Sequence, residues 1–192
     1  MKICKYITWV GLVILPLITF GQRRFSVELR GLGSFPTQEL NDTKLNVGLG
    51  LEALIDYHLL DQLGVYGGWS WNHFASDESF AGTKADFEET GYLFGLKLMY
   101  PIRESVLQPF VRLGGIYNHI EIENSQGDLI ADSEHGLGWQ AAAGVEIDLF
   151  ERFQLRPFLK YQQLNREVNI NENVFATDLR YLGAGLGLAW RF

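Results

Sequence analysis

The clearest pattern of hydrophobic and polar positions lies at the C-terminal end of the sequence. From Leu182 to Phe192 every second residue is apolar, and the residues between are glycine, alanine or arginine. A period of two places the apolar set on one face of a β-strand and the small or polar set on the other. The apolar face continues to Phe192, which favours a strand whose outer face contacts lipid and whose inner face is crowded.

The same alternation recurs along the sequence after residue 22. It predicts strands at 24–34, 45–58, 63–74, 87–100, 107–120, 137–149, 154–165 and 178–192. The long polar gaps are 35–44, 75–86, 121–136 and 166–177, and the short gaps are 59–62, 101–106 and 150–153. Long and short gaps alternate, as in an antiparallel meander with loops at one end and tight turns at the other. The sequence therefore predicts an all-β fold, a closed antiparallel up-and-down transmembrane β-barrel of about eight strands.

Aromatic residues on the apolar face fall near the two ends of the predicted strands. Tyr57 and Tyr100 lie at the short-gap end, whereas Trp71, Tyr117 and Trp139 lie toward the long-gap end. Two aromatic bands separated by aliphatic residues match the two interfaces of a membrane, so these residues are expected to form an aromatic girdle. The alternative is a soluble barrel of the lipocalin kind, with its aromatic residues inside.

Charged residues occupy the opposite face of the predicted strands. A barrel of about eight strands is only wide enough for side chains to fill it, and charges inside must pair or keep water. We therefore predict a side-chain-filled lumen rather than an open pore, with Glu146 flanked by Arg112 and Lys160. The predicted lumen charge network comprises Glu52, Lys97, Arg112, Glu146 and Lys160.

The N-terminal segment has the pattern of a secretory signal peptide. A short basic stretch with Lys2 and Lys5 precedes an apolar run from Tyr6 to Phe20, so residues 1–21 are expected to be cleaved from a barrel domain at 22–192. The alternative is a retained helix, but the run is shorter than the ~20 residues needed to span a bilayer. Without Lys2 and Lys5, 14 of the 16 basic residues face 23 acidic ones, a net charge of −9, which argues against a nucleic-acid partner.

Candidate chemistry is sparse. His73 and Ser76 are the nearest approach to a histidine-activated serine, but residues three apart on a strand lie on opposite faces. The acidic segment 128–134 lacks the ligand spacing and central glycine of a calcium loop. We therefore predict no catalytic residue, no cofactor and no metal site. The acidic long loops suit a solvated outer surface facing an anionic layer such as lipopolysaccharide, and plain solubility is the favoured explanation of their charge.

The apparent signal peptide, the alternating segments and the C-terminal Leu-Gly-Leu-Ala-Trp-Arg-Phe together resemble the small outer-membrane β-barrels of the OmpA/OmpX-like group, including the porin-family barrels of Bacteroidetes. The resemblance implies an outer-membrane location, contact with outer-membrane lipid and lipopolysaccharide, and recognition by the barrel assembly machinery through Leu188, Trp190 and Phe192. It supports a protein with a structural or surface-interaction role and no catalytic activity. The alternatives are a lipid A-modifying enzyme of the same shape and a soluble periplasmic carrier.

Overall fold

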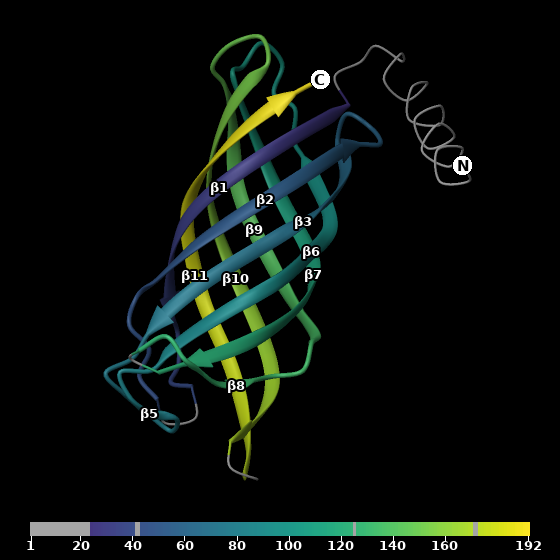
Figure 1. Ribbon diagram of the computed structural model, residues 1–192. Coiled ribbons are helices and arrows are strands. Elements are labelled where there is room, and N and C mark those ends of the chain that lie inside the picture. Colours follow the sequence, from purple (N-terminus) through teal and green to yellow (C-terminus); the bar gives the residue numbers. More distant parts are fainter. Residues whose placement is uncertain (1–23, 41–42, 125, 171–172) are drawn as a thin grey trace, which may run out of the picture.

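The computed structural model describes residues 24–40, 43–124, 126–170 and 173–192, and the expected signal peptide lies outside these ranges. Eight antiparallel strands form one closed barrel (Figure 1): β1 (Phe25–Pro36), β2 (Gly48–His58), β3 (Leu63–Ala75), β6 (Asp86–Met99), β7 (Leu107–Glu123), β9 (Gly136–Asp148), β10 (Phe153–Ile170) and β11 (Asn173–Arg191). Each of these strands pairs with the next one along the chain, and β1 pairs with β11 to close the barrel. The predicted eight-stranded meander is confirmed.

The two ends of the barrel differ. The short connections 59–62, 100–106 and 149–152 lie at the end that also holds the C-terminus, which we call the short-turn end (Figure 1). The opposite, long-loop end carries a small hairpin, β4 (Glu78–Ser79) with β5 (Gly82–Thr83), and the short strand β8 (Leu129–Asp132) paired with β7. Among the described residues, no helix is long and apolar enough to cross a membrane.

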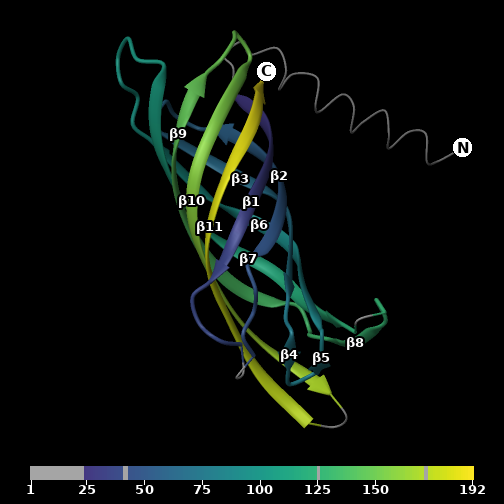
Figure 2. The ribbon, with the colours of Figure 1, turned by 90° about the vertical axis from the view of Figure 1, so that its left-hand side faces the viewer.

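The strands at the long-loop end are longer than the sequence pattern predicted. Residues 166–177 were expected to be a loop, but β10 and β11 stay paired as far as Ile170 and Asn173, and their hairpin projects beyond the other strands (Figure 2). The prediction was wrong because the polar residues of this segment were interpreted as a loop. The alternation in fact continues, with Leu164 and Val168 buried and Asn165 and Glu167 exposed, so the polar residues form the solvated face of a strand pair.

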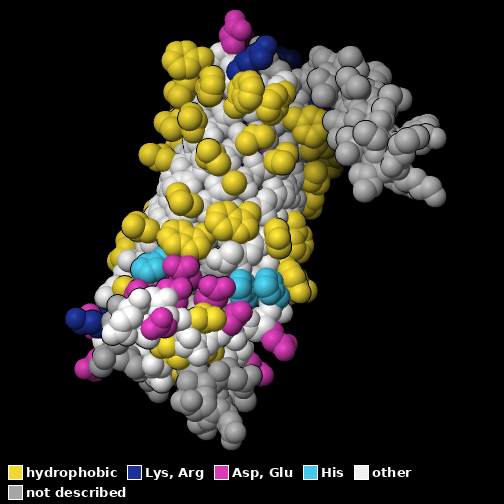
Figure 3. Space-filling model, in the orientation of Figure 1, with side chains coloured by type: hydrophobic (Ala, Val, Ile, Leu, Met, Phe, Trp, Pro, Cys, Tyr) yellow, Lys and Arg dark blue, Asp and Glu magenta, His cyan; other side chains and the backbone are white. Residues whose placement is uncertain are grey.

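A hydrophobic belt covers the outer wall of the barrel between the two ends (Figure 3). It comprises the outward, exposed residues of alternating positions, among them Leu29, Leu49, Leu51, Ile55, Trp69, Phe94, Leu96, Leu98, Val111, Leu113, Leu159, Leu182, Leu186 and Leu188. Burying these side chains against lipid rather than water is favourable, since each apolar side chain gains roughly 1.5–3 kcal/mol on leaving water. The belt therefore matches the apolar band of a membrane-spanning barrel.

Beyond the belt, the two faces of β7 exchange polarity. On β7 the outward residues change from Val111 and Leu113 to Glu121 and Glu123, while the inward residues change to Ile120 and Ile122, both fully buried. The long-loop end of the barrel is therefore built like a soluble protein, with a hydrophobic core inside. This interior core consists of Leu40, Leu45, Leu54, Tyr66, Phe74, Ala85, Phe87, Leu93, Ile116, Ile120, Ile122, Ala131, Leu164, Val168, Leu179 and Tyr181.

Candidate functional site: the layered barrel interior

The half of the interior nearest the short-turn end holds nine charged side chains, which we call the lumen ion cluster. All nine are buried, and they come from β1, β2, β6, β7, β9 and β10. The cluster comprises the acids Glu28, Glu52, Asp56 and Glu146 and the bases Arg30, Lys97, Arg112, Arg156 and Lys160. Buried charges of this number require mutual pairing, because each isolated ion out of water costs several kcal/mol or more.

Two arginines and two acids form the centre of the lumen ion cluster. Nη2 of Arg112 lies 2.8 Å from Oε2 of Glu28 and 2.7 Å from Oδ1 of Asp56. Nη1 of Arg156 lies 2.7 Å from Oε2 of Glu28 and also 2.7 Å from Oδ2 of Asp56. Each carboxylate therefore bridges both guanidinium groups, which links β7 and β10 to β1 and β2 through the middle of the barrel.

The remaining charges pair on either side of this centre. Glu52 accepts hydrogen bonds from Lys160 and, at 3.3 Å, from Nη1 of Arg30. Glu146 pairs with Lys97 and lies 2.9 Å from Nη2 of Arg156. All five members of the predicted lumen charge network thus lie in this cluster.

The predicted partners of Glu146 were wrong. Arg112 and Lys160 are both register partners of Ala142, whereas Glu146 is level with Gln108, four residues further along β9. Lys97, on β6, reaches Glu146 across the lumen from a strand that is not adjacent to β9 in the sheet. Sequence adjacency of strands predicts neighbours along the wall, but contacts through the lumen depend on the stagger of the strands around the barrel.

A single carboxyl lies between the lumen ion cluster and the interior core. Glu89 is 1% exposed, and it accepts hydrogen bonds from four neutral side chains. The phenol of Tyr181 donates to its Oε2 at 2.9 Å, and the amide of Asn118 donates to its Oε1 at 2.6 Å. Asn72 and Gln162 also donate to Glu89. Glu89 was not among the residues predicted for the lumen. It is an even number of residues from Lys97 on β6, so the period of two assigns both side chains to the inward face.

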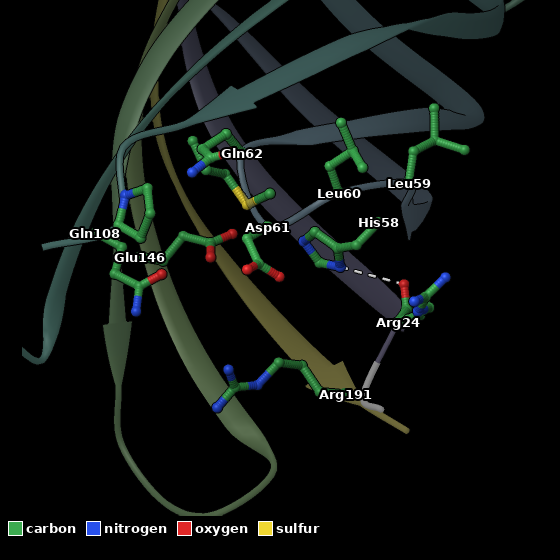
Figure 4. A pocket seen from close by; sticks show the side chains of 11 residues that line it. Arg24, His58, Leu59, Leu60, Asp61, Gln62, Gln108, Glu146 and Arg191 are labelled. Atoms are coloured by element: carbon green, nitrogen blue, oxygen red, sulfur yellow. Dashed lines mark hydrogen bonds between the residues drawn. The ribbon is translucent and has the colours of Figure 1, made fainter. Parts of the chain in front are cut away.

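A polar cavity of about 360 Å³ opens at the short-turn end and reaches the lumen ion cluster (Figure 4). Arg24, His58, Asp61, Glu146 and Arg191 supply its charged and titratable lining, and Nδ1 of His58 lies 3.2 Å from the carbonyl oxygen of Arg24. None of the described residues that line it carries a hydroxyl or thiol nucleophile. The cavity is therefore a polar mouth to the charged interior rather than a site built for nucleophilic catalysis.

The nearest serine–histidine candidate is not assembled. Nε2 of His73 lies 3.6 Å from Oδ2 of Asp86 on the outer surface. Ser76 is buried, and its hydroxyl has no hydrogen-bond partner. A histidine that activates a serine must lie within hydrogen-bond reach of the hydroxyl, and these two residues do not meet that condition.

The residues of the expected aromatic girdle lie near the two edges of the hydrophobic belt. Tyr57 contacts the ring of Phe25, with centroids 4.6 Å apart, and Tyr100 is exposed at the start of the short turn 100–106. Trp71, Tyr117 and Trp139 lie on outward positions toward the long-loop end. The C-terminal residues Leu188, Trp190 and Phe192 are all exposed on the outer wall, at the opposite edge of the belt.

Comparisons with known proteins agree with this architecture. A family model described as "Outer membrane protein beta-barrel domain" matches residues 19–192. Among curated proteins, none matches the chain in sequence.

Three solved structures illustrate the shared fold. Neisserial surface protein A is 13% identical, covering 88% of this chain and 97% of its own, with a TM-score of 0.65. OprG from Pseudomonas aeruginosa is 15% identical, covering 88% and 96%, with a TM-score of 0.62. Outer membrane protein W of E. coli is 14% identical, covering 88% and 97%, with a TM-score of 0.57. At these identities the likeness shows the fold alone.

Proposed function

This chain belongs to the outer-membrane β-barrel domain family and lies in the outer membrane, and on that premise we propose that it is a non-catalytic integral membrane protein with a side-chain-filled lumen. Its role is structural, and it presents the long-loop end as a rigid surface for interaction. In this family the short turns face the periplasm and the long loops face outward. We accordingly propose that the mature protein is residues 22–192, after removal of a signal peptide at 1–21.

The observation that carries this proposal is the stacking of three layers along the barrel axis. From the periplasmic end these are the lumen ion cluster, the Glu89 layer and the interior core. An eight-stranded barrel encloses only enough space for side chains, and these layers provide large, buried residues at every level. Conducting barrels use about 16–18 strands and leave a channel lined by solvated groups.

A surface-interaction role is supported by the ordered extension beyond the membrane. Leu40 and Leu45 of the first long loop are buried in the interior core, and Thr43 accepts a hydrogen bond from the backbone of Phe80 at 3.2 Å. These contacts hold the described residues of the first long loop and the β4–β5 hairpin to the barrel and to each other, so their outer surface has a fixed shape. Their exposed side chains are mainly acidic, which favours cations or cationic groups as partners.

Contacts with lipid and with the assembly machinery follow from the outer wall. We propose that Tyr57 and Tyr100 sit at the periplasmic interface, and that Trp71, Tyr117 and Trp139 sit at the lipopolysaccharide interface. The exposed side chains of Leu188, Trp190 and Phe192 on the last strand are the proposed signal for the barrel assembly machinery.

Two measurements test the proposal. Purified protein in planar lipid bilayers should show no steady conductance, and lipid A from a deletion strain should have an unchanged mass spectrum. A stable, voltage-independent conductance would contradict the filled lumen. A lipid A species that is lost on deletion and restored by the wild-type gene would contradict the non-catalytic role.

A further inference from the structure

Five metal-ligating side chains gather on the outer surface of β6, β7 and β8, at the long-loop side of the hydrophobic belt. We call them the rim cluster: Glu88, His119, Glu121, Glu123 and Asp132. Acidic and histidine side chains form one band beside the belt in Figure 3. Their ligand atoms make two overlapping groups that share Glu121, and within each group all the atoms lie within 4.8 Å of one another.

The imidazole of His119 faces a carboxylate on each side, at two different distances. Its Nδ1 lies 2.7 Å from Oδ1 of Asp132, which is a hydrogen bond. Its Nε2 lies 3.7 Å from Oε1 of Glu121, which is too long for a hydrogen bond. Two ligand atoms bound to one tetrahedral zinc ion, each about 2.0–2.1 Å from it, are themselves about 3.4 Å apart. The Nε2–Glu121 spacing is therefore close to that of two ligands of one ion.

The hydrogen bond to Asp132 has the form of a ligand-orienting contact. Metal-binding histidines usually donate their second ring N–H to a carboxylate, which fixes the tautomer and the ring plane. Asp132 is held opposite Glu121 by the pairing of β8 with β7. The ring of His135 stacks on that of His119, with centroids 4.3 Å apart and planes 15° apart. The imidazole is thus positioned from two sides, with Nε2 directed toward Glu121.

In the described part of the chain, no lysine or arginine neutralises three of the rim-cluster carboxylates. Glu88 is the register partner of Glu121, and like charges placed directly opposite each other on adjacent strands destabilise a sheet. Among the ion pairs of the described residues, none joins a lysine or arginine to Glu88, Glu121 or Glu123. Glu88 accepts one hydrogen bond, at 3.0 Å, from the indole of Trp71. A bound divalent ion would remove the repulsion among the three carboxylates.

We propose that the rim cluster binds one divalent transition-metal ion of the zinc type. His119 Nε2 and Glu121 are its ligands, Asp132 orients His119, and Glu88 and Glu123, whose carboxylates group with that of Glu121, add negative charge beside the ion. Mixed imidazole and carboxylate ligands suit zinc, whereas calcium takes oxygen ligands only. No sequence motif predicts this site, because its residues come from three strands that meet only in the barrel.

Isothermal titration of the EDTA-treated, folded full-length barrel in detergent with Zn²⁺ tests the proposal. We expect one ion per barrel, with this binding lost in His119→Ala and Glu121→Gln. Asp132→Ala should keep the stoichiometry and weaken binding about 10–100-fold, as for other orienting carboxylates. His58→Ala, at the periplasmic mouth, and Glu39→Gln, in the first long loop, are matched controls that should bind as the wild type does.

Heat-modifiable gel mobility of each variant shows that a loss of binding is not a loss of folding. Absence of stoichiometric binding by the wild type would overturn the proposal. So would binding that survives both His119→Ala and Glu121→Gln, since the zinc would then be held by the general acidic surface. A Ca²⁺ titration that matches the Zn²⁺ titration in the wild type and in His119→Ala would overturn it for the same reason.

Discussion

Arg156 and Glu28 form an ion pair of 2.7 Å inside the barrel, although 128 residues separate them in the sequence. Their strands are not adjacent, because β11 runs between β10 and β1. Gly187 of β11 is the register partner of Arg156 on one side and of Arg30 on the other. The ion pair therefore crosses the last strand at Gly187, where there is no side chain. The absence of a side chain at this inward position leaves room for the carboxylate of Glu28.

Substitution of Gly187 by alanine should destabilise the barrel. The added Cβ would lie 2.2 Å from Oε1 of Glu28. That oxygen cannot move freely, because it accepts a hydrogen bond from Nε of Arg30 at 2.6 Å. We expect a loss of about 1–3 kcal/mol in the free energy of unfolding, measured by urea denaturation in detergent. Gly31→Ala is the control, since a Cβ there meets nothing within 4 Å; equal effects of the two substitutions would contradict the crowding.

Removal of the Arg156 guanidinium should be more costly than removal of an exposed one. Arg156→Ala leaves Glu28 and Asp56 as buried acids with one cation fewer, and breaking a buried pair from one side typically costs about 3–5 kcal/mol. Arg180→Ala removes an arginine that pairs with Asp178 on the exposed surface, and little change is expected there. Denaturation midpoints of both variants in one detergent provide the comparison. Similar midpoints would show that the lumen ion cluster contributes nothing particular to stability.

The partners of Glu146 can be identified by double-mutant cycles. Glu146→Gln combined with Lys97→Met should show a coupling of about 0.5–3 kcal/mol, because the two side chains are in direct contact. The cycle of Glu146→Gln with Lys160→Met should show a much smaller coupling, since Lys160 pairs with Glu52. A larger coupling of Glu146 with Lys160 than with Lys97 would instead support the partner predicted from strand adjacency.

Truncation of Phe74 should loosen the long-loop end without removing the barrel from the membrane. This side chain is fully buried in the interior core, and its ring lies 5.3 Å from that of Tyr181. Phe74→Ala should cost about 3–5 kcal/mol, as for other buried phenylalanines. We expect faster proteolysis of the long loops in intact cells, with heat-modifiable mobility retained. Phe94→Ala, on the outer wall, should leave the loops as protected as in the wild type.

The sequence predicted the outer wall and the strand order but not the interior contacts. A bilayer imposes a period of two on every strand, so Leu96 and Leu186 could be assigned to the outer wall from parity alone. The partners of Glu146 depend on the stagger between strands that are distant in the sequence, which no local pattern records. For the same reason the rim cluster, with residues on β6, β7 and β8, was not visible in the sequence.

The interior core was missed for a different reason. A lumen that is polar along its whole length predicts polar inward residues at both ends of each strand. Ile120 and Ile122 are instead apolar, inward and fully buried. The exchange of faces on β7 can be read from the sequence. Up to Tyr117 the outward positions are mainly apolar, whereas beyond it the inward Ile120 and Ile122 are apolar and the outward positions are charged. The corresponding change on β10, where Leu164 and Val168 are inward and Asn165 and Glu167 outward, explains why this segment continues as a strand rather than forming a loop.

The apolar side chains of the wall face lipid, and β7 leaves the membrane where its faces exchange polarity. Nitroxide labels at Leu96→Cys, Leu186→Cys and Asp128→Cys of the mature protein, reconstituted in lipid bilayers, distinguish lipid-facing from water-facing positions. Labels at positions 96 and 186 should be relaxed mainly by oxygen, which partitions into lipid, and the label at 128 mainly by a polar nickel complex. Greater access of the nickel complex than of oxygen at positions 96 and 186 would show that these side chains face water and not lipid.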